Sequence, residues 1–372
     1  MVEPDANALT GAPAIAPDAV SFIRSEQERG YRNLAIKLGL GADPREAYAR
    51  LSGKPVPPDS SFPYEDPQRI EILKIIFGSV QRALAAAGEA PFDPAPQFAS
   101  LPTGDVNARV MPEPKSGIPV IFFEQGLFQY FYDFGQLVGW AAPPIPEDLL
   151  GDDEALSTMA HRYTMPYEAS DSFVQSLCSY AFEGSPLVKA PRIAPPVHNM
   201  PLCIVLLNLM ERFVVLHELS HIKLGHVKEA APEPGHEFEA DASSFWWGSY
   251  MARQDRLAWA MSYWACELAL VAFNILYRAI AVAEFGGQMP AWVDRSHPDP
   301  MARRERLRLI WLDPRVPAAG VSAARGLCAM TEALVQRLWE FAAAGLLLAR
   351  ERGAGPSPMW RTLIDSTFVE KR

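Results

Sequence analysis

The sequence predicts a mainly α fold of the α+β class, with long helices and one small antiparallel sheet or hairpin. Long helical stretches recur along the chain, and Pro- and Gly-rich passages separate them. Two short β-rich runs, 106–111 and 119–123, flank the turn-forming segment 112–117 and suggest a hairpin. With 372 residues the chain is long enough to bury a large core.

The first part of the chain, 1–103, is predicted to be a helical N-terminal region with Pro-rich linkers. Its expected helices are 21–38, 44–51 and 69–87, and its Pro-rich passages are 53–67 and 91–102. The remainder, 104–372, is expected to form a second region that carries the hairpin and the candidate site. Its long helices are expected from 204 to about 225, from about 236, and at 253–285, 300–312 and 320–350.

The segment from His217 to His221, which reads His-Glu-Leu-Ser-His, lies in the predicted helix that begins near residue 204. Residues four apart on a helix lie almost above one another, so His217 and His221 can reach the same metal ion. Glu218 lies a little further round the same turn. Two imidazoles and a carboxylate in this arrangement are typical of zinc hydrolases.

Zinc in hydrolases takes three protein ligands and keeps a fourth position for water, so the two histidines need a partner. A metzincin would carry Gly and His three and six residues after His221, but Leu224 and Val227 stand there. A gluzincin supplies Glu from a second helix, with Asp four residues later. Glu237 and Asp241 have this spacing.

The two helices are expected to form an antiparallel hairpin, because the turn-forming segment 228–235 separates them. That hairpin would return Glu237 to His217 and His221, and Asp241 would accept the free ring N–H of a ligand histidine. Metal chemistry alone leaves three rivals for the third ligand, which are His226, His236 and Glu239. We prefer Glu237 because Asp241 lies one helical turn away from it.

Several blocks of the sequence resemble the gluzincin peptidases, especially the CAAX-prenyl proteases and stress-induced membrane peptidases. In order they are Asn107-Ala108, 118–123, Gly126-Leu127, the zinc motif with Gly225-His226, Glu237 to Asp241, and Ser296-His297-Pro298 with Arg303 and Leu307. The resemblance covers about residues 107–307 and implies a gluzincin-like helical core with the sheet beside the active-site helix. The soluble phage-exclusion Lit peptidases carry a similar motif.

The resemblance implies a soluble zinc-dependent endopeptidase that hydrolyses peptide bonds with Zn²⁺ as its cofactor. Glu218 would be the general base that takes a proton from the attacking water. His297 would stabilise negative charge on the carbonyl oxygen, and Arg303 would order the loop that holds His297. The other interpretation of His297 is that it only caps the helix that starts near Pro300. The alternative is a regulatory binding protein in which zinc only braces a helical hairpin.

Peptidases of this kind commonly bind substrate as an additional strand on an exposed sheet edge. If the segment 118–123 is that edge, Ile118, Val120 and Phe122 belong to the substrate-binding strand. The other interpretation is an ordinary buried hairpin.

Composition favours a soluble, cytoplasmic protein, and the resemblance to peptidases implies that it acts on a protein or peptide. The net charge of −10 argues against nucleic acid or an anionic membrane as the main partner. The longest apolar runs are limited by Glu211, Glu267 and Arg278, so no membrane span is expected. The segment 1–20 contains no Lys or Arg, so no signal peptide is expected.

Overall fold

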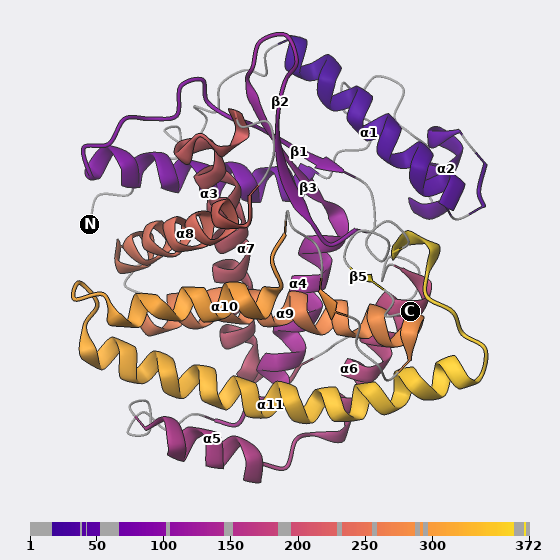
Figure 1. Cartoon of the computed structure of the whole chain (residues 1–372), viewed down its shortest axis with the longest axis vertical. Coiled ribbons are helices and arrows are strands. Elements are labelled where there is room, and N and C mark those ends of the chain that lie inside the picture. Colours follow the sequence, from indigo (N-terminus) through magenta and orange to yellow (C-terminus); the bar gives the residue numbers. More distant parts are fainter. Residues whose placement is uncertain are drawn as a thin grey trace.

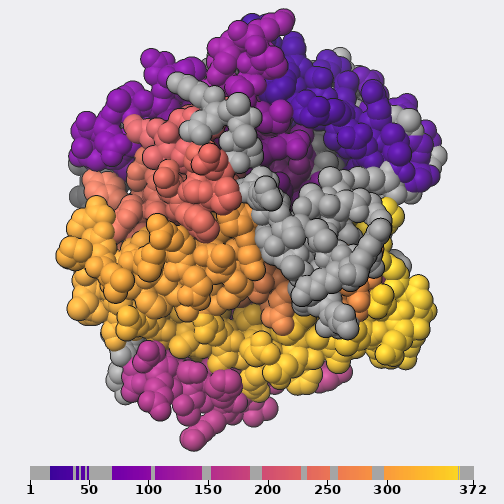
Figure 2. All heavy atoms as spheres, viewed as in Figure 1, coloured from indigo at the N-terminus to yellow at the C-terminus, as the bar shows by residue number. Residues whose placement is uncertain are grey.

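The computed structural model describes residues 17–37, 39–41, 43–52, 67–101, 105–144, 152–184, 195–228, 233–254, 259–286, 291–292, 297–360 and 368–369. Helices make up most of this described chain, and a small three-stranded sheet lies at one end of the helical body (Figure 1). The predicted class, mainly α with a small sheet, is confirmed. Figure 2 shows the N-terminal helices, in indigo and purple, at one end of the molecule and the C-terminal helices, in orange and yellow, towards the other.

The N-terminal helices match the predicted ones to within a few residues, and they are α1 (Pro17–Lys37), α2 (Pro44–Ser52) and α3 (Pro67–Ala86). The other helices are α4 (Gln125–Ala141), α5 (Asp153–Arg162), α6 (Tyr167–Cys178), α7 (Met200–Leu224), α8 (Pro234–Gln254), α9 (Trp259–Phe285), α10 (Pro300–Arg308) and α11 (Ala318–Glu351). Short 3-10 or π turns are Ser179–Glu183, Val197–Asn199, His226–Lys228, Leu309–Leu312 and Pro358–Trp360.

Two expectations about the elements need correction. The stretch predicted as one helix over 253–285 is divided, because α8 reaches Gln254 and α9 begins at Trp259. Residues 255–258, and most of the predicted linker 53–67, lie outside the described residues. The Pro-rich passage 91–102 contains a strand that was not predicted, and the helices α4, α5 and α6 were not predicted either.

The three-stranded sheet consists of β1 (Gln97–Leu101), β2 (Ala108–Pro112) and β3 (Pro119–Glu124), in the order β1-β3-β2. β2 and β3 pair antiparallel, which confirms the predicted hairpin. β1 pairs with β3 in parallel, so the sheet is mixed rather than purely antiparallel. Because β1 belongs to 1–103 and the other strands to 104–372, the two predicted regions share one sheet. The short strands β4 (Ala291–Trp292) and β5 (Phe368–Val369) form a separate pair.

Both faces of β3 are buried, and they pack on different partners. Val120 and Phe122 are fully buried and pack with Ile23 of α1. Ile121 and Phe123 belong to the main core that the long helices form. Successive side chains of a strand point to opposite faces, so this one strand joins α1 to the helical body.

α7 is the central helix for function, and its two ends follow ordinary helix rules. Pro201 stands in its first turn, where a missing backbone N–H costs nothing. Gly225 ends the helix with φ of 84°, and its N–H donates to the carbonyl oxygens of His221 and Ile222. The residues from Phe213 to Ser220 are buried. The histidine motif therefore lies in the interior, shortly before the helix stops.

Two segments are long and apolar enough to cross a membrane by length and composition, namely Val197–Leu224 and Trp259–Phe285. Buried residues make up 56% and 67% of their most apolar windows. Core helices of soluble proteins have the same properties. The absence of a membrane span therefore stays a prediction.

Candidate metal centre

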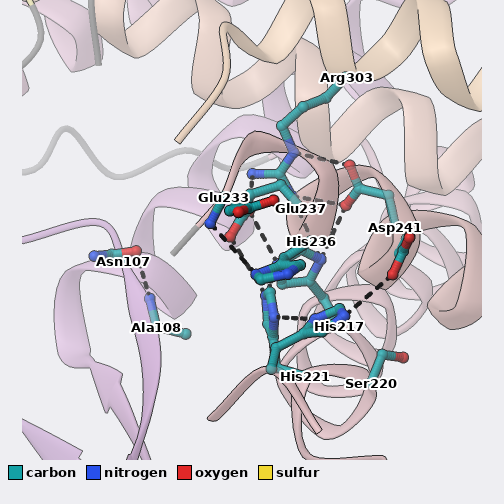
Figure 3. A network of polar contacts seen from close by, with 12 residues as sticks. Asn107, Ala108, His217, Ser220, His221, Glu233, His236, Glu237, Asp241 and Arg303 are labelled. Carbon is teal, nitrogen blue, oxygen red and sulfur yellow. Dashed lines mark hydrogen bonds and ion pairs between the residues drawn. The ribbon is translucent and has the colours of Figure 1, made fainter. Parts of the chain in front are cut away.

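His217, His221 and Glu237 come together where the C-terminal part of α7 meets the first turns of α8 (Figure 3). The Nε2 atoms of His217 and His221 lie 3.0 Å apart. The Glu237 carboxylate lies 3.3 Å from His217 Nε2 and 3.4 Å from His221 Nε2. Three potential ligand atoms thus face one point from two helices, and this group can hold a metal ion.

Asp241 lies on the other side of the His217 ring. Its Oδ1 is 2.9 Å from His217 Nδ1, so the carboxylate accepts the Nδ1–H and the Nε2 atom is directed at Glu237. This is the contact that the spacing of Glu237 and Asp241 along one helix predicts. Asp241 therefore sets both the tautomer and the orientation of the His217 ring.

Arg303 of α10 extends into the same group and binds the Asp241 carboxylate through two hydrogen bonds. Its Nε and Nη2 donate to the two Asp241 carboxylate oxygens at 2.8 and 2.7 Å. Its Nη1 lies 3.1 Å from Glu237 Oε2. Planar guanidinium and carboxylate groups match in this geometry, so Arg303 holds both acids in position. The Asp299 side chain stabilises the start of α10 by accepting a hydrogen bond from the Met301 N–H.

The charged side chains of this group shift one another's pKa values. Burial disfavours the charged His217 ring, but the Glu237 carboxylate and the Asp241 hydrogen bond outweigh burial and raise its pKa to about 10. Burial works against ionised Glu237 as well, yet Arg303 and His217 hold its pKa far below the usual value. The pKa of Asp241 is lowered too, since Arg303 outweighs burial. Without a metal, the site attracts a proton to the position that a cation would fill.

Glu218 lies next to His217 in the motif, is buried, and lines a cavity of about 220 Å³ beside the three ligand atoms. Burial raises the pKa of Glu218 to about 7, with the His217 charge acting in the opposite direction. A carboxyl group with a pKa near neutrality can both accept and return a proton.

His297 also lines this cavity, although its side chain is exposed. It is close enough to Glu218 for its charge to lower the pKa of that acid. Arg303 has described contacts with Asp241, Glu237 and His217. Its contacts therefore tie α10 to the ligand helices. Its expected role in ordering the loop of His297 stays a prediction, since residues 293–296 lie outside the described part of the chain.

The three rival ligands do not join the group. His226 faces the opposite side of the His221 ring, with its Nδ1 at 3.0 Å from His221 Nδ1. Glu239 lies 3.2 Å from His226 Nε2, and the His236 ring stacks on the His226 ring with centroids 4.1 Å apart. These residues form an outer layer around His221, whereas Glu237 faces the Nε2 atoms of both ligand histidines.

The prediction that 118–123 is the exposed edge strand is wrong. β3 is the central strand, with β1 on one side and β2 on the other, so neighbouring strands occupy both of its backbone edges. Val120 and Phe122 are fully buried, and Ile118 lies in the hairpin turn, where its carbonyl oxygen accepts from the Glu113 N–H. None of these residues lines the cavity at the metal centre.

The strand that borders the cavity is β2. Asn107, Ala108, Arg109 and Val110 line the cavity together with the metal centre, and Asn107 and Ala108 lie beside it in Figure 3. Within the described residues, no strand pairs with the other edge of β2. The Asn107-Ala108 block was the available signal for this strand, but local sequence does not show which strand of a hairpin lies at the edge.

Comparisons with protein-family models, with curated proteins and with solved structures find no match for this chain.

Proposed function

We propose that the protein is a soluble zinc-dependent endopeptidase. The observation that carries the proposal is the convergence of His217, His221 and Glu237 beside Glu218 at a cavity. Two imidazoles, one carboxylate and an adjacent free carboxyl form the set of groups that zinc peptidases use. No thiol belongs to this group, although closed structural zinc sites often use thiolates.

The spacing of the donor atoms supports zinc as the metal. Ligand atoms about 2.0–2.2 Å from a tetrahedral zinc ion lie roughly 3.3–3.6 Å from one another. Here the two Nε2 atoms lie 3.0 Å apart, Glu237 Oε2 lies 3.3 Å from His217 Nε2, and Glu237 Oε1 lies 3.4 Å from His221 Nε2, all close to this range. Nitrogen ligands with one carboxylate suit zinc better than magnesium or calcium, which prefer oxygen ligands alone. His217, His221 and Glu237 would therefore hold the ion.

The role of Glu218 follows from its pKa and its place at the cavity. A bound zinc ion would supply Lewis acidity toward water and toward the peptide carbonyl. Glu218 would take a proton from the attacking water and return it to the amine that leaves. Its pKa of about 7 suits a group that must accept and donate in one cycle. A nearby cation favours the ionised form, which is the form that acts as a base.

His297 would assist by contacting the reacting carbonyl group of the substrate. It lines the same cavity and is exposed to an incoming substrate. An imidazole N–H can donate a hydrogen bond to the carbonyl oxygen as negative charge develops there. Arg303 would act indirectly, because its hydrogen bonds hold Asp241 and its ion pair holds Glu237.

The outer edge of β2 would bind the substrate. A peptide in extended conformation can pair with the backbone of 107–110, which borders the cavity. Main-chain pairing tolerates varied side chains, so it suits a protein or peptide substrate rather than a small molecule. We also propose a cytoplasmic location, without a membrane span and without nucleic acid as a partner.

The decisive experiment compares the wild-type protein with Glu218→Gln on a proteome-derived peptide library, with mass spectrometry to detect new termini. We expect zinc-dependent cleavage by the wild type and a loss of about 10²–10⁴-fold in Glu218→Gln. Glu218→Gln should still bind one zinc ion per chain, because it is not a ligand. Glu305→Gln, which changes an exposed acid on α10, is the matched control and should cleave normally.

A zinc-loaded wild type that cleaves nothing, or cleavage that Glu218→Gln leaves unchanged, would contradict the proposal. The first of these results would favour a binding protein in which the metal braces the α7–α8 hairpin.

A further inference from the structure

We infer that His226 and Glu239 are positioning residues that hold His221 in the tautomer able to bind metal. The inference rests on the proposed metal site and concerns how that site is kept ready. It starts from a chain of three contacts that runs from the surface to the ligand. Glu239 contacts His226, His226 contacts His221, and His221 faces His217 and Glu237.

Glu239, at the outer end of this series of contacts, fixes the direction of each hydrogen bond between it and His221. The Glu239 carboxylate accepts hydrogen bonds but donates none when ionised. It lies 3.2 Å from His226 Nε2, so a neutral His226 ring carries its proton on Nε2. The Nδ1 atom of the same ring then has a free lone pair and acts as the acceptor.

The same reasoning continues inward to the metal ligand. His226 Nδ1 lies 3.0 Å from His221 Nδ1, so His221 must donate its Nδ1–H across this contact. The proton of a neutral His221 ring is then on Nδ1, and the Nε2 lone pair is free. That lone pair faces His217 Nε2 at 3.0 Å and Glu237 at 3.4 Å, where the metal would bind.

The reverse arrangement would disable the site. If His226 carried its proton on Nδ1, it would donate to His221 and move the proton of His221 to Nε2. An N–H would then point at the position of the metal. Glu239 prevents this state, because it would lose the Nε2–H of His226 as its donor.

Packing keeps the His226 ring in place. Its side chain is 7% exposed, and it follows directly after Gly225, which ends α7. The His236 ring stacks on it at 4.1 Å with an angle of 14° between the planes. His221 and His217 thus each have an outer partner, which is another imidazole for His221 and the Asp241 carboxylate for His217.

The test measures zinc affinity by competition with a chromophoric chelator, using the full-length protein. We expect His226→Leu to weaken zinc binding about 10–100-fold, the usual cost of losing an outer hydrogen-bond partner of a metal ligand. His226→Gln should remain within a few-fold of the wild type. Its amide oxygen can accept from His221, and its NH₂ group can donate to Glu239. A purely structural role of the buried ring predicts similar effects for both variants.

A second measurement locates the protons directly. In zinc-loaded protein labelled with ¹⁵N-histidine, the NMR signals of His226 should show the proton on Nε2, and those of His221 should show it on Nδ1. A proton on His226 Nδ1, or equal zinc affinity in His226→Leu and the wild type, would overturn the inference. The wild-type spectrum shows which nitrogen of His226 carries the proton, so it tests the inference even if His226→Leu does not fold. A wild type that binds no zinc would instead contradict the proposed function.

Discussion

Neighbouring arginines of α10 belong to two buried clusters of charged side chains, one at the metal centre and one around Glu267. Arg303 holds Asp241 and Glu237 at the metal centre, whereas Arg304 holds Glu267 of α9 with a contact of 2.8 Å. Arg308 adds two contacts to Glu267 at 2.9 and 3.0 Å. Both clusters consist of buried carboxylates with guanidinium partners.

The difference lies in the balance of donors and acceptors. In the second cluster the two oxygens of Glu267 receive hydrogen bonds from Arg304, Arg308 and the Tyr263 hydroxyl, so its acceptors are satisfied. In the first cluster, the Nε2 atoms of His217 and His221 and the Glu237 carboxylate face one another, and they share only the proton that the raised pKa of His217 retains there. A buried ion pair is therefore weak evidence for a site, whereas an excess of acceptors at one point indicates a place for a cation.

Arg303→Met should break the first cluster and give the largest effect. It leaves Asp241 and Glu237 buried with less compensation, so zinc-free protein should lose about 3–5 kcal/mol of unfolding free energy. Zinc should restore a large part of this loss, because the cation supplies positive charge beside the same carboxylates. Urea unfolding with zinc or with EDTA measures both values. An equal loss in both conditions would show that the cluster is structural, like that of Glu267.

Glu237→Gln should lose most of the bound zinc. A zinc site binds with about 10–16 kcal/mol shared among its ligands, so one ligand carries on the order of 3–4 kcal/mol, or several hundredfold in affinity. Glu239→Gln should keep zinc binding within a few-fold, since an amide oxygen can still accept from His226. Metal analysis after dialysis distinguishes the two variants. The reverse pattern would make Glu239 the third ligand.

Arg304→Met tests the second cluster and should not respond to zinc. Glu267 keeps Arg308 as a partner, so the expected loss is about 3 kcal/mol, at the lower end for a broken buried ion pair. The zinc affinity should equal that of the wild type, because the metal centre keeps Arg303. A fall in zinc affinity would show that the two clusters are coupled through α10.

Glu211→Gln extends the comparison to a third buried acid, and it is the one variant of the four that should gain stability. Burial raises the pKa of Glu211 to about 7 from 4.5, with Arg69 acting in the opposite direction. The folded protein thus binds more protons than the unfolded chain between these pH values, and stability falls as the pH rises through that window. Glutamine cannot lose a proton, so the variant should be more stable above pH 7 by up to about 3 kcal/mol, which corresponds to a pKa difference of about 2.5 units.

Urea unfolding at pH 5 and pH 8 checks this prediction. The variant should resemble the wild type at pH 5 and exceed it at pH 8. A gain of equal size at both pH values would indicate a packing effect instead.

Much of the fold could be predicted because its signals are local. Apolar spacing and breaker residues located α1, α2, α3, α7, α10 and α11, and the turn-forming segment 112–117 indicated the β2–β3 hairpin. The spacing of His217 and His221 required only the pitch of one helix. A pairing of Asp241 with one of the two ligand histidines was predicted from its place one turn after Glu237, and the structure shows that the partner is His217.

Tertiary packing alone decided which strand lies at the sheet edge. It also decided which of the possible third ligands faces His217 and His221 and which lie outside that group. β1 inserts beside β3 from a Pro-rich passage and makes β3 central, so the edge that borders the cavity belongs to β2. His226 and Glu239 attach to the outer side of His221, and Arg303 reaches Asp241 across 62 residues of chain. Helix spacing is a property of a few neighbouring residues, whereas these choices depend on how segments far apart in the chain pack against one another.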